Sequence, residues 1–158
     1  MIEAGSTIDT NFTLNIVENG KEKEVSFSDL LSQPVVVSVY MKNNTSSCDK
    51  QNKSLAEHND AIEQLGYKVI AISKDGCRSH KNYIEKHDLP YILASDPDYN
   101  FSNAVDSVVE KKMFGNTYEG PSRSAFFIDT DGTVQAVIKK VTSAKHGEEV
   151  IETIKSIS

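Results

Sequence analysis

A short run of β-branched residues, followed by a polar loop and a helix, constrains this chain more than any other feature. Residues 34–40 read Pro-Val-Val-Val-Ser-Val-Tyr, a composition typical of a buried strand. Residues 41–48 are mostly polar, and residues 49–65 place three large apolar side chains on one helical face. A buried strand that leads directly into a helix is the start of a strand–helix–strand unit, which predicts an α/β fold.

Strand and helix patterns alternate along the rest of the chain. Asn19-Gly20 is a hairpin signal between an alternating strand at 12–17 and a returning segment at 21–25. The other expected strands are at 67–73, 90–94, 124–129 and 133–138, the expected helices are at 79–87, 101–109 and 148–157, and a loop is expected at 115–121. This order predicts a single domain over residues 1–158, with a mixed central sheet, helices on both faces and an N-terminal β-hairpin.

The cysteine at position 48 falls at the junction between the buried strand and the helix that follows it. Thr45, Ser46 and Ser47 are residue types that cap helix N-termini, so Cys48 is expected in the first helical turn. Free N–H groups and the positive end of the helix dipole favour the thiolate there, and the thiolate is the reactive form. Free cysteines are also common as inert core residues, so the pattern alone leaves both interpretations open.

Charge and cysteine content exclude several classes of protein. The net charge of −6 argues against binding to nucleic acid or to an anionic membrane, and the Lys111-Lys112 pair is expected to be solvated. Two cysteines do not make a disulfide scaffold, and the N-terminus lacks the pattern of a signal peptide. No apolar stretch approaches the ~20 residues of a membrane span. A cytoplasmic protein with reduced cysteines is therefore expected.

Five segments of the chain form a recognisable series. They are Asn11-Phe-Thr-Leu14, Lys42-Asn-Asn-Thr-Ser-Ser-Cys48, Ile72-Ser-Lys-Asp-Gly-Cys-Arg-Ser-His80, Leu89-Pro-Tyr-Ile-Leu-Ala-Ser-Asp96 and Met113-Phe-Gly-Asn-Thr-Tyr-Glu-Gly-Pro-Ser-Arg123. In this order they resemble segments of the peroxiredoxins, and most closely of the bacterioferritin-comigratory-protein or PrxQ branch. The resemblance covers nearly the whole chain. It implies a thioredoxin-like fold and the reduction of hydroperoxides by a peroxidatic cysteine.

Three positions carry the family's catalytic roles over to this chain. Cys48 matches the peroxidatic cysteine, Thr45 the hydroxyl that hydrogen-bonds thiolate and peroxide, and Arg123 the arginine that holds both. These residue types suit the reaction, because negative charge builds on the departing oxygen and fixed donors stabilise it. A guanidinium stays charged and offers several donors in a rigid fork. Without the resemblance, Arg123 would read as part of a surface salt bridge.

The chain departs from the family's active loop at several positions. Met41 stands where the family has proline, Ser46-Ser47 where it has Pro-Gly, and Gln51 where glutamate is common. Proline fixes backbone geometry, whereas methionine can shield a thiolate without fixing φ. These departures, together with the absence of a cysteine at position 53, motivate an alternative. In that alternative the chain is a thioredoxin-fold redox sensor or binding module with little turnover.

The second cysteine, Cys77, is a possible resolving residue. A sulfenic acid on Cys48 would condense readily with a thiol. Relatives carry the resolving cysteine five residues after the first one, here Lys53, or further along at about Ile84. Because residues seven apart lie close to one helical face, Cys77 and position 84 can face the same way. Either Cys77 resolves Cys48 in an intramolecular disulfide, or an external thiol does.

The sequence therefore predicts a thiol peroxidase that reduces hydrogen peroxide or alkyl hydroperoxides. Thioredoxin or a small thiol is the expected reductant. No metal and no cofactor are expected, because the cysteines and histidines do not show the spacing of a metal site. His80 lies on the same expected helix as Cys77 and could polarise a thiol, but a surface role is expected for it. The resemblance also implies a monomer.

Overall fold

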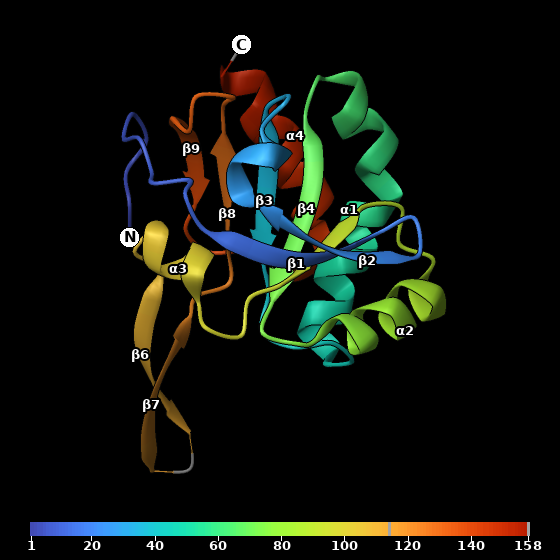
Figure 1. The fold of residues 1–158 in the computed structure, drawn as a ribbon, viewed down its shortest axis with the longest axis vertical. Coiled ribbons are helices and arrows are strands. Elements are labelled where there is room, and N and C mark those ends of the chain that lie inside the picture. The colour runs from blue at the N-terminus through green and yellow to red at the C-terminus, as the bar shows by residue number, and fades with distance from the viewer. Residues whose placement is uncertain (114, 158) are drawn as a thin grey trace.

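A computed structural model describes residues 1–113 and 115–157 of the chain, so Phe114 of the motif quoted above and Ser158 lie outside the described residues. Its centre is one seven-stranded sheet with the strand order β2-β1-β5-β4-β3-β8-β9 (Figure 1). The strands of this sheet are β1 (Thr13–Glu18), β2 (Lys21–Ser26), β3 (Val35–Val39), β4 (Lys68–Ser73), β5 (Ile92–Ser95), β8 (Ser124–Ile128) and β9 (Val134–Ile138).

The sheet is mixed, as the sequence predicts. Strands β3, β4 and β5 run parallel, while β1 and β8 pair antiparallel with the two edges of this parallel core. The predicted N-terminal hairpin is β1–β2, with both residues of its Asn19-Gly20 turn at positive φ. The carboxyl ends of the parallel strands lie at one end of the sheet, where open α/β sheets form their sites.

Helices cover both faces of the sheet. The helices are η1 (Phe27–Leu30), α1 (Ser46–Gln64), α2 (Cys77–His87), α3 (Asn100–Ala104), η2 (Ser143–Lys145) and α4 (His146–Ile157). One face packs on α1, α2 and α4 through a buried cluster that includes Leu55, Tyr83 and Val150. The other face packs on η1 and α3 through Phe27 and Phe101. All five residues of β3 are buried, which fits a central strand whose two faces are both covered.

The segment after β5 differs from the sequence-based prediction. The helix expected over 101–109 is wrong beyond Ala104, and the loop expected over 115–121 is largely a strand. Strands β6 (Val108–Met113) and β7 (Asn116–Pro121) form a two-stranded antiparallel sheet that projects from the body (Figure 1). The helix stops because Asp106 adopts a positive φ of 53°, and the β-branched pair Val108-Val109 favours extended backbone after it.

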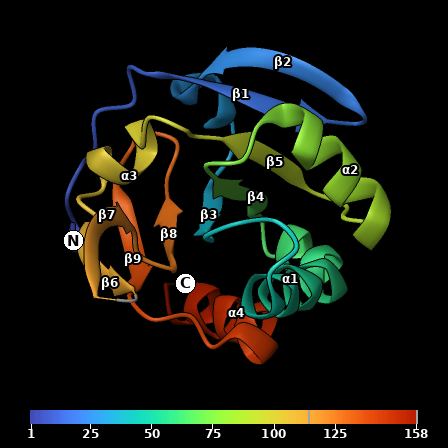
Figure 2. The ribbon, with the colours of Figure 1, turned by 90° about the horizontal axis from the view of Figure 1, so that it is seen from below.

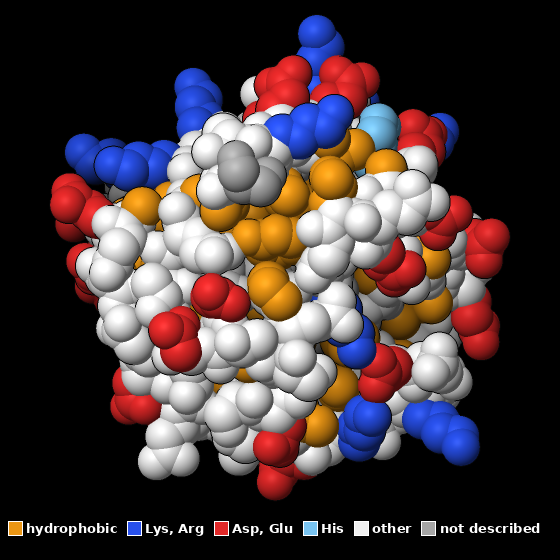
Figure 3. Space-filling view, turned by 90° about the horizontal axis from the view of Figure 1, so that it is seen from above, with side chains coloured by type: hydrophobic (Ala, Val, Ile, Leu, Met, Phe, Trp, Pro, Cys, Tyr) orange, Lys and Arg blue, Asp and Glu red, His pale blue; other side chains and the backbone are white. Residues whose placement is uncertain are grey.

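Helices α1 and α4 lie side by side on one face of the sheet (Figure 2). Gly147 makes this close approach possible: a Cβ placed there would lie 2.4 Å from the His58 ring and 2.5 Å from the Ser54 carbonyl. The Gly147 N–H also donates to Ser54 Oγ at 2.9 Å. The amino end of α4 is thereby fixed against the third turn of α1. Figure 3 shows the molecule from the end opposite to that seen in Figure 2. Apolar side chains gather there and charged side chains surround them.

Candidate active site

Cys48 is the third residue of α1, directly beyond the carboxyl end of β3. Its side chain is only 2% exposed, and its Sγ accepts a hydrogen bond from the Met41 N–H at 3.4 Å. The sulfur therefore lies in the turn between strand and helix, where backbone N–H groups are free to face an anion. The predicted position in the first helical turn is confirmed.

Two tyrosines bury the region around the sulfur. The rings of Tyr40 and Tyr83 stack with centroids 6.2 Å apart, and both belong to the same apolar cluster as Cys48. Burial is the main cause that raises the pKa of each phenol, and the negative charge of the cysteine adds to the shift. Tyr83 also donates to Asp49 Oδ1 at 2.7 Å. The two rings thus shield one side of the sulfur from water and hold the first turn of α1 against α2.

Thr45 is the N-cap residue of α1, but its backbone carbonyl, rather than its hydroxyl, makes the hydrogen bond to the helix. The Thr45 carbonyl accepts from the Asp49 N–H at 2.8 Å, and its hydroxyl donates to the Lys42 carbonyl at 2.9 Å. The hydroxyl makes no capping bond to the helix. It closes the loop before α1 instead, on the same turn as the cysteine.

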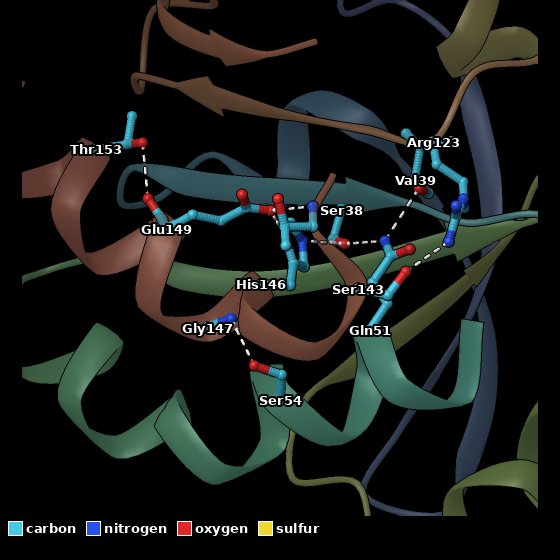
Figure 4. A network of polar contacts seen from close by, with 11 residues as sticks. Ser38, Val39, Gln51, Ser54, Arg123, Ser143, His146, Gly147, Glu149 and Thr153 are labelled. Atoms are coloured by element: carbon cyan, nitrogen blue, oxygen red, sulfur yellow. Dashed lines mark hydrogen bonds and ion pairs between the residues drawn. The ribbon is translucent and has the colours of Figure 1, made fainter. Parts of the chain in front are cut away.

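Arg123 reaches the same end of the sheet by strand pairing. In the antiparallel pair of β3 and β8, Ser124 lies opposite Val39, so the preceding Arg123 lies beside the residues that follow β3. Its Nη1 donates to Ser143 Oγ of η2 at 2.7 Å (Figure 4). The guanidinium is partly exposed and forms no ion pair among residues 1–113 and 115–157.

A pocket of 300 Å³ opens between the cysteine loop, the β6–β7 hairpin and the segment after β9. We call it the cationic pocket; it is lined by Met41, Val109, Lys111, Ser122, Arg123, Lys139, Lys140 and Val141. Four of these eight side chains are cationic and none is acidic. Met41 is the link to the sulfur, because its backbone donates to Cys48 while its side chain lines the pocket.

Cys77 begins α2, at the same end of the sheet as Cys48. It is 7% exposed, and both cysteines are free thiols. Burial raises the pKa of the Cys77 thiol, and the Glu22 carboxylate of the neighbouring hairpin raises it further. Cys77 is therefore a thiol at rest, while Cys48 has amide dipoles around it.

Asn43 ties the cysteine loop to the first turns of α2. Its Nδ2 donates to Ser79 Oγ at 3.0 Å and to His80 Nδ1 at 3.1 Å, and its backbone N–H donates to Asp75 Oδ2 at 2.9 Å. His80 Nε2 in turn donates to the Ala94 carbonyl at 3.0 Å, which leaves Nδ1 as the acceptor. The segments that carry the two cysteines are thus joined through one buried amide.

A second buried network lies under the first turns of α1. Gln51 donates to Ser38 Oγ at 3.0 Å and to the Val39 carbonyl at 3.2 Å (Figure 4). Ser38 contacts His146 Nε2 at 2.9 Å, and His146 Nδ1 contacts Glu149 at 2.7 Å. An uncharged amide at position 51 suits this site, because its Nε2 donates to a hydroxyl and to a carbonyl, which a carboxylate cannot do.

Within the described ranges, no group of three His, Cys, Asp or Glu side chains is arranged to hold a metal ion. No helix in the same ranges is long and apolar enough to cross a membrane.

The structure overturns two surface assignments made from the sequence. Lys111 is half-buried in the cationic pocket rather than solvated, while its neighbour Lys112 is exposed. His80, expected to play a surface role, is fully buried. In a strand the side chains alternate between faces, so a strand assignment for 108–113 would have separated the two lysines. The expected elements leave residues 110–114 unassigned between a helix and a loop, so this alternation is missed.

The reactive cysteine lies at the amino end of the helix that follows a central parallel strand, next to the cationic pocket. This arrangement defines a thiol-dependent oxidoreductase of the thioredoxin fold. Residues 8–137 match the model of the AhpC/TSA family. A relative from Haemophilus influenzae is 33% identical over 88% of this chain and 90% of its own. Peroxiredoxin Bcp of Bacillus subtilis is 31% identical over 85% of each chain.

The chain therefore belongs to the AhpC/TSA family, and the relatives named here are Bcp peroxiredoxins. Solved structures agree: a PrxQ variant from Xylella fastidiosa superposes with a TM-score of 0.88 at 25% identity, over 99% of this chain and 97% of its own. The resemblance inferred from the sequence and the thioredoxin-like fold are confirmed. The chain is a thiol peroxidase, with a peroxide substrate and a thiol reductant.

Buried His80 predicts a pH dependence of stability. Burial lowers the pKa of His80 from its usual 6.5, so the folded protein keeps it neutral where the unfolded chain binds a proton. The free energy of unfolding should therefore fall as pH drops below about 6.5, by at most about 1.4 kcal/mol per pH unit from this residue.

Urea unfolding from pH 8 to pH 5 measures this dependence, with His80→Gln as the comparison. Glutamine retains a donor for the Ala94 carbonyl but does not titrate. The variant should lose part of the acid sensitivity that the parent shows. Parallel stability curves for the two proteins would contradict the assignment.

Proposed function

We propose that Cys48 is the peroxidatic residue and that Arg123 and Thr45 complete its site. The observation that carries this proposal is the position of the sulfur: it accepts a backbone N–H bond at the start of α1, next to a pocket rich in cations. In the reaction, the Cys48 thiolate attacks the terminal oxygen of a hydroperoxide. A sulfur–oxygen bond forms as the O–O bond breaks, and the sulfur is oxidised to a sulfenic acid while the peroxide is reduced to an alcohol or water.

Arg123 is suited to the charge that develops in this step. The departing oxygen carries away an electron pair, and a fixed guanidinium stabilises that charge at no cost of reorganisation. Within the described residues its guanidinium donates to Ser143, and its other N–H groups are available to the peroxide. Ser143 belongs to η2, so the start of α4 helps orient the guanidinium.

Thr45 supplies a hydroxyl on the same loop. In the resting structure this hydroxyl donates to the Lys42 carbonyl. As the substrate enters, rotation about one side-chain bond would let the hydroxyl donate to the thiolate or to a peroxide oxygen and accept from the O–H of the peroxide. Hydrogen peroxide and alkyl hydroperoxides both present the two oxygens that this arrangement requires.

Cys77 is proposed to resolve the sulfenic acid in an intramolecular disulfide. Its thiol attacks the sulfur of Cys48, a disulfide forms, and the sulfenic oxygen leaves as water. Both cysteines start helices at one end of the sheet, and Asn43 joins their segments. The first turn of α1 has to unwind, because a disulfide needs Cα atoms within about 7 Å. The raised pKa of Cys77 keeps its thiol protonated at rest, so that peroxide reacts at Cys48 first.

Thioredoxin or a small thiol is proposed to regenerate the enzyme by exchange with that disulfide. Two free cysteines suit a reducing compartment such as the cytoplasm. The proposed active form is a monomer in which residues 1–158 act as one domain, since the elements that meet at the site come from most of its length.

Substitution of Arg123 tests the catalytic site. Arg123→Met should slow the oxidation of Cys48 by hydrogen peroxide about 10²-fold, the usual cost of one lost donor to a developing oxyanion. Quenched-flow mass spectrometry of the Cys48 peptide measures the rate. Arg78→Met is the matched control, because Arg78 is exposed on α2. Equal rates for the two variants, or peroxidase turnover retained by Cys48→Ser, would contradict the proposal.

The role of Cys77 is tested by disulfide mapping after one equivalent of peroxide. The parent protein should yield a Cys48–Cys77 peptide under non-reducing conditions. Cys77→Ser should instead accumulate sulfinic acid on Cys48 as peroxide is raised, since nothing within the chain condenses with the sulfenic acid. A parent digest without the linked peptide would show that an external thiol resolves Cys48.

A further inference from the structure

The ammonium group of Lys111 is held in the cationic pocket by two uncharged acceptors. Its Nζ donates to the Met41 Sδ at 2.8 Å and to the Pro121 carbonyl at 2.6 Å. Met41 is the residue whose backbone N–H contacts the reacting sulfur. Met41 therefore lies between Lys111 and Cys48 and contacts both. An ammonium has three N–H bonds, so the Lys111 Nζ can still donate one more hydrogen bond.

Among residues 1–113 and 115–157, no carboxylate forms an ion pair with Lys111 or with Arg123. A partly desolvated cation without an anion is unfavourable unless an anion is present at some stage. The anions that the reaction brings to this place are the thiolate and the departing oxygen.

The electrostatic surroundings make Lys111 a better proton donor than an ordinary lysine. Burial lowers its pKa most, the Arg123 guanidinium lowers it further, and Lys74 adds a smaller effect in the same direction. The negative charge of Cys48 opposes these effects. Consumption of that thiolate during the reaction removes the opposing charge, so the ammonium gives up its proton more readily as the O–O bond breaks.

We propose that Lys111 is a further catalytic residue, which donates a proton to the oxygen that leaves the peroxide. This inference rests on the proposed role of Cys48. The thiolate attacks the terminal oxygen, the O–O electron pair passes to the departing oxygen, and a proton from Lys111 converts that oxygen to an alcohol or water. The lysine is left as a neutral amine and recovers a proton from solvent.

Arg123 cannot take this part, because a guanidinium does not lose its proton in proteins. The pocket thus divides two tasks between two cations: Arg123 stabilises charge, and Lys111 supplies the proton. To reach the departing oxygen, the Lys111 ammonium exchanges its bond to the thioether sulfur, a weak acceptor, for one to a strong acceptor.

The experiment compares electrophiles whose leaving groups differ in their need for a proton. Hydroxide from hydrogen peroxide needs one, whereas acetate from peracetic acid and iodide from iodoacetamide do not. Lys111→Met should slow the oxidation of Cys48 by hydrogen peroxide about 10²-fold, the typical contribution of a general acid. Reaction with peracetic acid should change far less. Lys112→Met, at the exposed neighbouring position, is the matched control.

Lys111→Arg separates charge from proton donation. This variant retains the positive charge beside the sulfur, so it should react with iodoacetamide and peracetic acid at the parent rate. It should still be slow with hydrogen peroxide. A thermal melt equal to the parent's shows that each variant is folded.

An equal loss with hydrogen peroxide and peracetic acid, or no loss with either, would overturn the assignment of Lys111 and leave Cys48 as the nucleophile. A parent protein whose Cys48 reacts with hydrogen peroxide no faster than a free thiol would overturn the proposed function itself. The two failures are therefore distinguishable.

Discussion

The hydrogen bond from the Met41 N–H to the Cys48 sulfur is the interaction on which the site depends. It exists because the buried central strand β3 ends at Val39 and α1 begins at Ser46, with one short loop between them. The strand fixes the position of Met41 and the helix fixes that of Cys48, so the Met41 N–H points at the sulfur.

Elements distant in the chain converge on this junction. The antiparallel pairing of β8 with β3 brings Arg123 alongside it, and the β6–β7 hairpin brings Lys111. Helix α2 presents Tyr83 and His80 from one side, while His146 of α4 contacts Ser38, to which Gln51 of α1 also donates. The result is an asymmetric site: apolar and hydrogen-bonded on the helical side, cationic and open on the hairpin side.

Much of this could be predicted from the sequence, because strong local patterns coincide with the resemblance. The buried strand, the following helix and the cysteine between them depend on periodicity and capping residues close in the chain. Arg123 could be assigned only through the resemblance, since its place beside β3 is a matter of strand pairing across more than 80 residues. Sequence periodicity carries no information about such a contact.

The features that could not be predicted have physical reasons of the same kind. Val108-Val109 follows a short helix, and only the positive φ of Asp106 reveals that the chain turns there into a hairpin. The burial of His80 depends on partners from the cysteine loop and from β5. Lys111 lies in the pocket because of the same hairpin, which the expected elements do not include.

The central claim is that the fold makes the sulfur of Cys48 far more reactive toward an O–O bond than an ordinary thiol. The second-order rate of its oxidation by hydrogen peroxide, measured beside free cysteine at the same pH, tests this most directly. Because the site holds several fixed donors, the rate constant of Cys48 should exceed that of free cysteine by at least about 10³-fold. A rate equal to that of free cysteine would contradict the account.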